Sequence, residues 1–87
     1  MEVLEFADGL LLTAENLPRA VDEVTTEDVI NTVMTLAEAE GMKLEDRGRD
    51  CGNDTFHIGG TLFSWSEDET EEGEAAVLVE SEDEEED

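Results

Sequence analysis

A chain of 87 residues has room for one domain with one modest hydrophobic core. Its 27 Asp and Glu residues against 4 Lys and Arg give a formal net charge of −23, which disfavours direct binding to nucleic acid, because contacts to phosphates need basic side chains. The same charge is repelled by anionic membranes, and no apolar stretch approaches the roughly 18 residues needed to span a bilayer.

The single cysteine and the first residues of the chain indicate a reducing compartment. Cys51 has no second cysteine with which to form an intramolecular disulfide. The N-terminal stretch MEVLEFADG lacks the basic region and the long apolar stretch of an export signal. We therefore expect a cytoplasmic protein, located in the cytoplasm of the host cell if its origin is viral.

The first quarter of the chain predicts a hairpin and a connection. Residues 2–13 contain two short apolar segments around Asp8-Gly9, a dipeptide typical of a type I′ turn between two strands. One longer strand with a glycine bulge is the alternative. In residues 14–24, Pro18 suits the first turn of a short helix, so we expect a connection with about one helical turn.

Residues 26–40 give the clearest element, a helix. Thr25 and Asp28 have the spacing of a capping pair, and Gly41 provides a stop signal at the other end. Between them the apolar residues fall on one stripe of a helix, which consists of Val29, Ile30, Val33, Leu36 and Ala37.

After the helix we expect a short strand and a polar loop. Met42 and Leu44 alternate with charged residues, which is the pattern of a strand. The polar segment 46–54 follows, in which Gly48 and Gly52 are expected to form turns.

A second hairpin is predicted around the two-residue turn Gly59-Gly60. Its register places one aromatic pair and one aliphatic-threonine pair opposite each other, with the tryptophan on the same face of the sheet. The residues concerned are Phe56 with Phe63, Ile58 with Thr61, and Trp65.

The remainder is acidic except for one apolar segment. The acidic run 67–74 is expected to link the second hairpin to a buried central strand, residues 75–79. Residues 80–87, ESEDEEED, contain nothing to bury and predict a disordered tail. The sequence thus predicts one acidic α+β domain, residues 1–79. Its main helix, about 26–40, packs on one face of a small, mainly antiparallel sheet of four to six strands.

Little in the sequence indicates catalysis. A Cys-His nucleophilic pair needs the two side chains within hydrogen-bond reach and a third group that orients the histidine. We expect instead that His57 lies on the polar face of a strand and that Cys51 is a buried or half-buried thiol. We therefore expect no enzymatic activity and no cofactor.

The metal-binding patterns are also incomplete. One cysteine and one histidine fall short of the four ligands that zinc normally takes. Asp46, Asp50 and Asp54 are spaced by four, unlike the ligands of a calcium loop. Weak, nonspecific cation binding by this loop is left open, whereas a dedicated metal site is not expected.

The charge favours a protein that binds a basic partner. A globule of this length is about 30 Å wide, and the same length of duplex DNA holds about 18 phosphate charges. In size and charge the chain resembles the small acidic phage proteins that block restriction enzymes, uracil-DNA glycosylase or CRISPR effectors. The resemblance implies a non-enzymatic nucleic-acid mimic that inhibits a DNA- or RNA-binding enzyme. The candidate contact residues are Glu67, Asp68, Glu69, Glu71 and Glu72, with Trp65 as an anchor at the rim.

Two other interpretations stay open. Proteins of salt-accumulating microbes favour Asp and Glu over Lys, so the acidity could reflect a high-salt cytoplasm in a small α+β protein of another role. Alternatively, the acidic tail, residues 80–87, binds a basic protein as a chaperone. A homodimer formed through an exposed strand edge is a further open possibility.

Overall fold

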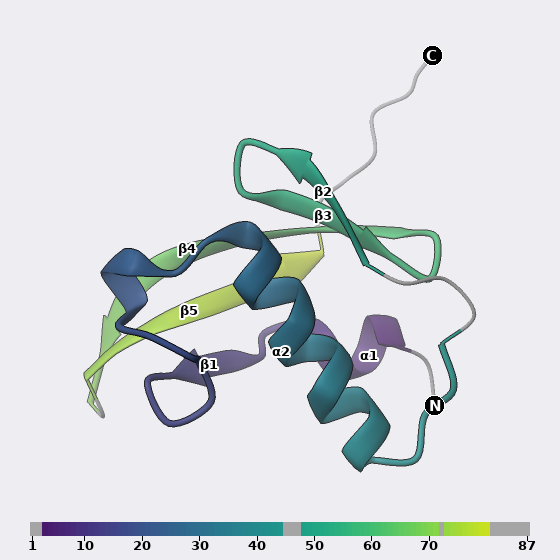
Figure 1. Ribbon diagram of the computed structural model, residues 1–87, viewed down its shortest axis with the longest axis horizontal. Helices are drawn as coiled ribbons and strands as arrows, with labels where there is room; N and C mark the ends of the chain where they lie inside the picture. The colour runs from purple at the N-terminus through teal and green to yellow at the C-terminus, as the bar shows by residue number, and fades with distance from the viewer. Residues whose placement is uncertain (1–2, 45–47, 72, 81–87) are drawn as a thin grey trace.

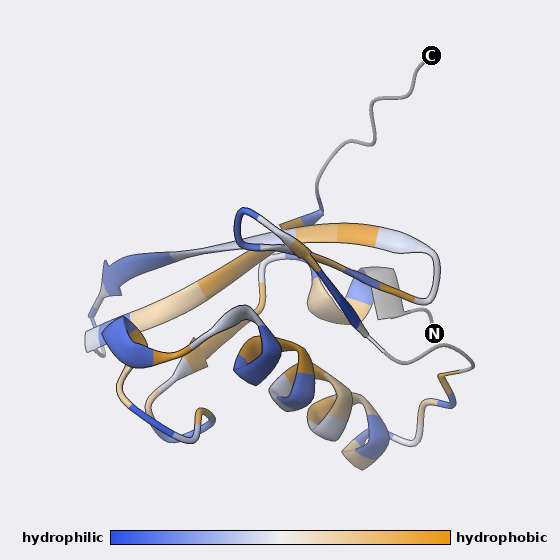
Figure 2. Ribbon diagram, turned by 45° about the horizontal axis from the view of Figure 1, so that its top comes forward, coloured by the Kyte–Doolittle hydropathy of each residue, from blue (hydrophilic) through white to orange (hydrophobic). Residues whose placement is uncertain are grey.

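The computed structural model describes residues 3–44, 48–71 and 73–80. It is a two-layer α+β fold, in which a five-stranded antiparallel sheet lies above the helices in the view of Figure 2. The predicted fold class is confirmed. In chain order the elements are α1 Val3–Ala7, β1 Leu11–Thr13, the 3₁₀ turn η1 Val21–Glu23, α2 Thr26–Ala39, β2 Arg49–Gly52, β3 Thr55–Ile58, β4 Thr61–Thr70 and β5 Gly73–Glu80 (Figure 1).

The strand order across the sheet is β1-β5-β4-β3-β2, and each neighbouring pair is antiparallel. β5 lies between β1 and β4, so the segment 75–79 is an interior strand, as its apolar composition predicted. Ala76 and Leu78 of β5 point toward the helices and are fully buried. We call this helix-covered side the inner face of the sheet and the opposite side the outer face.

Helix α2 begins and ends where local signals place it. The Thr25 hydroxyl accepts a hydrogen bond from the Asp28 backbone N–H at 3.3 Å, and the Asp28 carboxylate accepts one from the Thr25 backbone N–H at 3.1 Å. This capping box satisfies two N–H groups that the first turn leaves unpaired. After Ala39 the chain leaves the helix through Gly41, whose φ of +85° favours glycine. The predicted helix is confirmed.

The core is formed where α2 and η1 cover the inner face. Phe56 and Phe63 face each other across β3 and β4 with ring centroids 5.7 Å apart, and both are fully buried. Ile58 lies opposite Thr61, so the predicted register of the second hairpin is confirmed. The Trp65 indole N–H donates to the Thr26 hydroxyl at 3.0 Å, which joins β4 to the start of α2.

The predicted N-terminal hairpin is wrong. Val3–Ala7 is a short helix, and only Leu11–Thr13 is a strand. Gly9 has a φ of +76°, but Asp8 does not have a positive φ, so a type I′ turn does not form. Instead the Gly9 N–H donates to the Leu78 carbonyl at 2.6 Å, and the Asp8 side chain accepts from the Glu80 N–H at 3.1 Å. The turn itself thus pairs with the edge of β5, and no strand is needed there.

The strand predicted at Met42 and Leu44 does not form, and the predicted polar loop contains a strand. The Met42 N–H donates to the Ala37 carbonyl and closes the helix end, while Met42 and Leu44 pack against the core as irregular chain. The edge of β3 is paired instead by β2, through a turn in which Asn53 and Asp54 have φ values of 53° and 61°. Two positive φ values define the I′ geometry that suits a two-residue hairpin.

The acidic run 67–74 is not a linker, because β4 continues to Thr70 and β5 begins at Gly73. β5 also includes Glu80, the first residue of the predicted tail, and the rest of that tail lies outside the described residues. The molecule measures 37 × 30 × 20 Å. Within the described part of the chain, no helix is both long enough and apolar enough to cross a bilayer.

Candidate functional site

The candidate site is the far end of the β4–β5 hairpin, residues 67–74, which we call the acidic arm. β3 pairs with β4 only as far as Ser64, and β1 pairs with β5 only as far as Ala75. Beyond these points β4 and β5 pair only with each other, and the arm forms the end of the two longest strands (Figure 1). The arm is therefore held by a regular ladder, and no other described strand pairs with either of its edges.

The arm has a high density of carboxylates. Six of its eight residues are Asp or Glu. Because a strand rises about 3.3 Å per residue and the hairpin folds back on itself, the arm is roughly 13 Å long. The five described carboxylates of the arm, Glu67, Asp68, Glu69, Glu71 and Glu74, therefore lie at roughly one per 2.6 Å, a density of the same order as the phosphate spacing of about 1.7 Å along a DNA duplex.

Strand alternation divides these carboxylates between the two faces. Glu69 lies directly opposite Glu74, and Glu67 lies opposite Ala76, so the three glutamates share the inner side of the arm. Asp68 lies opposite Ala75 and is on the outer side. Like charges directly across a strand pair are destabilising, so the Glu69–Glu74 pair costs the hairpin stability unless a cation approaches.

The basic residues do not neutralise the arm. Within residues 3–44, 48–71 and 73–80 the structure has one ion pair, which joins Arg19 Nε to Asp28 Oδ2 at 3.0 Å. Lys43 follows α2 and Arg49 begins β2, and both side chains are exposed. Among the described residues, the carboxylates of the arm are therefore available to an external cation.

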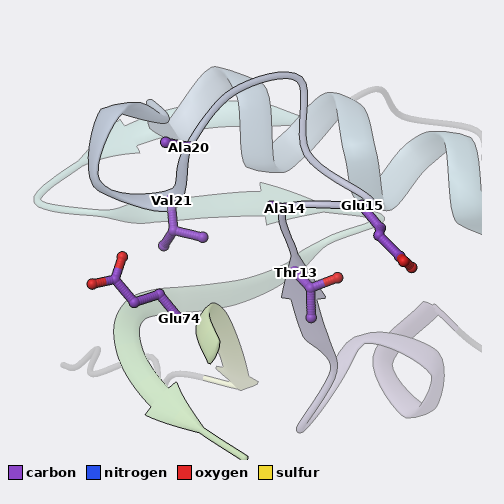
Figure 3. A pocket seen from close by; sticks show the side chains of 6 residues that line it. All are labelled: Thr13, Ala14, Glu15, Ala20, Val21 and Glu74. Atoms are coloured by element: carbon purple, nitrogen blue, oxygen red, sulfur yellow. The ribbon is translucent and has the colours of Figure 1, made fainter. Parts of the chain in front are cut away.

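A hollow of about 640 Å³ adjoins the arm, between the end of β1, the segment that follows it and the start of β5. Figure 3 shows Val21 of η1 pointing into this hollow near Glu74, while Glu15 points away from Glu74 on the other side. The remaining lining consists of Thr13, Ala14 and Ala20. An apolar wall beside a carboxylate suits a long cationic side chain, whose methylene stem packs on apolar groups while its charged end stays in water.

The predicted contact residues are placed as follows. Glu67, Asp68, Glu69 and Glu71 are all exposed on the arm, and Glu72 lies outside the described residues. Trp65 has only 8% of its surface exposed and is tied to Thr26 in the core. Its burial disfavours the predicted role as a rim anchor. Sequence reasoning missed Glu74 as a contact residue, because only the strand register places it opposite Glu69.

Cys51 and His57 are closer than the sequence indicated. Cys51 Sγ lies 2.8 Å from His57 Nδ1, and the thiol is exposed rather than buried. The bulged register between Asp50 and Gly52 brings Cys51 toward β3. No hydrogen bond to His57 Nε2 is found among the described residues, so the third group that a nucleophilic pair uses to orient its histidine is not in place there.

Across the described chain, no three side chains of His, Cys, Asp or Glu are grouped in a way that could hold a metal ion. Of the three loop aspartates, Asp46 lies outside the described residues, Asp50 lies in β2 and Asp54 lies in the β2–β3 turn.

Comparisons of the chain with protein-family models, with curated proteins and with solved structures find no match.

Proposed function

We propose that this protein is a non-enzymatic binding protein that imitates nucleic acid and occupies the basic groove of a DNA- or RNA-binding enzyme. The observation that carries the proposal is the acidic arm, where the five described carboxylates lie on a two-stranded hairpin with no basic partner among the described residues. A groove that binds phosphates presents Lys and Arg side chains, and these would find a similar density of negative charge on the arm.

The electrostatic cost of the arm supports this reading. The hairpin places Glu69 directly opposite Glu74, where a neutral pair would be more stable. Residues that break a local stability rule without a compensating contact are expected at functional sites. A cationic groove would provide the missing compensation.

The shape of the molecule is compatible with such a groove. Its longest dimension of 37 Å equals a length of duplex that carries about 22 phosphate charges. Residues 1–80 alone hold 21 acidic and 4 basic residues, a net charge of −17, so the body is strongly anionic without the tail.

The hollow beside the arm adds a specific contact to the proposal. A Lys or Arg side chain of the enzyme would place its stem on the exposed Ala14 and Ala20 and its charged end beside Glu74. Such a contact would fix the position of the arm within the groove, whereas diffuse charge alone would not.

The proposal has consequences for partner and location. The partner is a basic protein surface, and the protein itself does not bind nucleic acid. We further propose that it acts in the cytoplasm, or in the host-cell cytoplasm if it is viral, where enzymes that handle nucleic acid are accessible.

The deciding experiment is a pull-down from host lysate at about 0.15 M salt with two variants of equal charge. In the first, Glu67, Glu69 and Glu74 of the arm are changed to Gln. In the control, three exposed glutamates of the α2 region are changed to Gln, namely Glu27, Glu38 and Glu40. We expect the wild type and the control to recover a basic nucleic-acid enzyme that added duplex DNA releases.

The arm variant should recover at least about tenfold less of that enzyme, because it lacks the charges that the groove contacts. Equal loss in both triple variants would mean that net charge alone drives capture. Recovery of no nucleic-acid enzyme by the wild type would contradict the proposal.

A further inference from the structure

The β2–β3 hairpin at the edge of the sheet brings together two side chains that the proposed function does not use. Cys51 is the only cysteine of the chain and His57 is the only histidine, yet Cys51 Sγ lies 2.8 Å from His57 Nδ1. The strand register shifts between Asp50 and Gly52, so Cys51 is the extra residue of a bulge and pairs with no residue of the described β3. Bulges re-aim side chains and are over-represented next to active sites.

The thiol is accessible from solvent. Free cysteines are among the most buried residues in proteins, because the thiol behaves as a small apolar group. Cys51 departs from this rule, since it is exposed, and His57 beside it is half-buried. The described structure gives the sulfur one further hydrogen bond, to the Arg49 carbonyl at 3.6 Å. The sulfur thus contacts a base and can still be reached by a small molecule.

The charge of the protein selects among the reagents that could reach this thiol. The chain has a net charge of −23, and the neighbouring Asp50 and Asp54 are exposed. Arg49, which pairs directly with His57, is the one basic residue in the described β2 and β3 strands. An anionic reagent would approach against the field of the whole protein, whereas an uncharged reagent would not. The site therefore favours small uncharged electrophiles.

We propose that Cys51 is a modification site for hydroperoxides and that His57 accepts the thiol proton as the sulfur reacts. The sulfur attacks the terminal oxygen of the hydroperoxide, so an S–O bond forms and the O–O bond breaks. The sulfur is oxidised to a sulfenic acid and the peroxide is reduced. The proton taken up by His57 Nδ1 passes to the departing oxygen, which leaves as water or an alcohol. Because each thiol is consumed once, the reaction is a modification and not catalytic turnover.

The pair is separate from the acidic arm. Cys51 and His57 belong to β2 and β3, whereas the arm belongs to β4 and β5. The inference is therefore independent of the proposed function, and either one can fail without the other.

The first test measures alkylation of the full chain by iodoacetamide, an uncharged electrophile, at about pH 7.4 and about 0.15 M NaCl. Since the chain has one cysteine, the mass of the intact protein reports on Cys51 alone. His57→Gln keeps a polar side chain that cannot take up a proton, so it should slow alkylation at least about tenfold. Arg49→Gln is the control for the effect of a nearby cation and should change the rate by less than about threefold.

The second test uses hydrogen peroxide on the same proteins. Wild-type Cys51 should form a sulfenic acid that dimedone traps, at least about tenfold faster than in His57→Gln. Cys51→Ser should give no dimedone adduct. Iodoacetate, which carries the reactive carbon of iodoacetamide together with a negative charge, should react faster as NaCl rises from about 0.02 to 1 M. The iodoacetamide rate should stay within about twofold over that range.

A spectroscopic measurement distinguishes proton acceptance from a purely structural role of His57. The protein has one histidine, so its ring nitrogens give unambiguous NMR signals. Cys51→Ala should shift the Nδ1 resonance, because the contact with the sulfur is lost. This measurement leaves His57 in place, and circular dichroism checks that each variant is folded.

Four results would overturn the inference. The first is a folded His57→Gln variant that reacts with iodoacetamide as fast as the wild type. The second is a rate that falls in Arg49→Gln and not in His57→Gln, which would assign activation of the thiol to the guanidinium. The third is an Nδ1 resonance that Cys51→Ala leaves unchanged. The fourth is alkylation by iodoacetamide without sulfenic acid formation by hydrogen peroxide, which would exclude hydroperoxides as the reagent.

Discussion

The roles of several single residues in this protein depend on tertiary contacts that cannot be identified from the sequence. Gly48 was expected to form a turn, yet its importance lies in packing. A methyl group at this position would overlap Cγ2 of Ile30 and lie 3.2 Å from Cγ1 of Ile58. Glycine therefore lets the chain enter β2 close against α2 and β3, two elements that are distant in sequence.

We expect Gly48→Ala to destabilise the fold by about 1–3 kcal/mol, the usual cost of forcing an extra carbon into a packed core. Urea denaturation followed by circular dichroism measures this change. In an Ile30→Ala background, which removes the methyl group that the new carbon would overlap, the cost should be clearly smaller. The same cost in both backgrounds would contradict the steric explanation.

The hydrogen bond between Trp65 and Thr26 gives a second prediction at this scale. Thr26→Val keeps the shape of the side chain but removes the acceptor of the buried indole N–H, which should cost about 1–3 kcal/mol. Thr35→Val is the control, since Thr35 is exposed and bonds only within its own helix, and it should change stability by about 0.5 kcal/mol or less. Urea denaturation of both variants, followed by fluorescence of the only tryptophan, gives the comparison; equal effects would refute a special role for this bond.

Among the elements, the β4–β5 hairpin combines a buried half that stabilises strand pairing with an acidic half that destabilises it. Its inner residues near the core are Trp65 and Leu78, a buried pair that favours pairing. Toward the tip the same ladder pairs Glu69 with Glu74, and the repulsion between these two carboxylates opposes strand pairing. The buried half of the hairpin thus holds the acidic half in a conformation that the acidic half would not favour alone.

Neutralising one member of the glutamate pair should therefore stabilise the protein. We expect Glu74→Gln to raise the thermal midpoint at about 0.02 M NaCl by more than Glu15→Gln, which removes an equal charge outside the ladder. At about 1 M NaCl the two variants should converge, because exposed charges are then screened within about 3 Å. Melts followed by circular dichroism test this; a difference that persists at high salt would indicate a cause other than repulsion.

For the whole molecule, two explanations of the negative charge are compared: binding of a basic partner and adaptation to a high-salt cytoplasm. A core of aromatic and aliphatic residues closes between α2 and the sheet, with Phe56, Phe63 and Leu12 fully buried. The acidic residues of the strands lie mainly at the ends and margins of the sheet, away from this core. Such an arrangement should fold without molar salt.

A melt across salt concentration tests this expectation. We predict a cooperative transition, and hence a folded protein, at about 0.1 M NaCl, with moderate stabilisation as salt screens repulsion. A chain that is unfolded at about 0.1 M and folds only above about 2 M would favour adaptation to a high-salt cytoplasm. That outcome would remove the main support for mimicry.

Removal of residues 81–87 distinguishes binding by the acidic arm from binding by the acidic tail. The cut lies after Glu80, the last residue of β5, whose N–H bonds to the Asp8 side chain, so the described ladder stays complete. We expect the truncated protein to recover the same enzyme in the pull-down, since the arm is retained. Loss of capture would favour an acidic-tailed chaperone instead.

The elements with local signals could be predicted from the sequence. The capping residues Thr25 and Asp28 together with Gly41 defined α2, and Gly59-Gly60 with its flanking alternation defined the β3–β4 register. Capping and turn signals act between residues that are only a few positions apart, so all the interacting groups can be identified from the sequence. The density of negative charge is likewise a property of composition alone.

Strand pairing and the packing of the helices on the sheet depend on residues that are far apart in the chain, and the sequence did not predict them fully. The Asp8-Gly9 turn, and not a strand of residues 3–7, pairs with the edge of β5, while residues 49–52 form a strand on the edge of β3. Strand pairing also produces the approach of Cys51 to His57 and the Glu69–Glu74 pair. A strand is stabilised by a neighbouring strand that is often distant in sequence. Whether a segment forms a strand therefore depends on residues that its own sequence pattern does not contain.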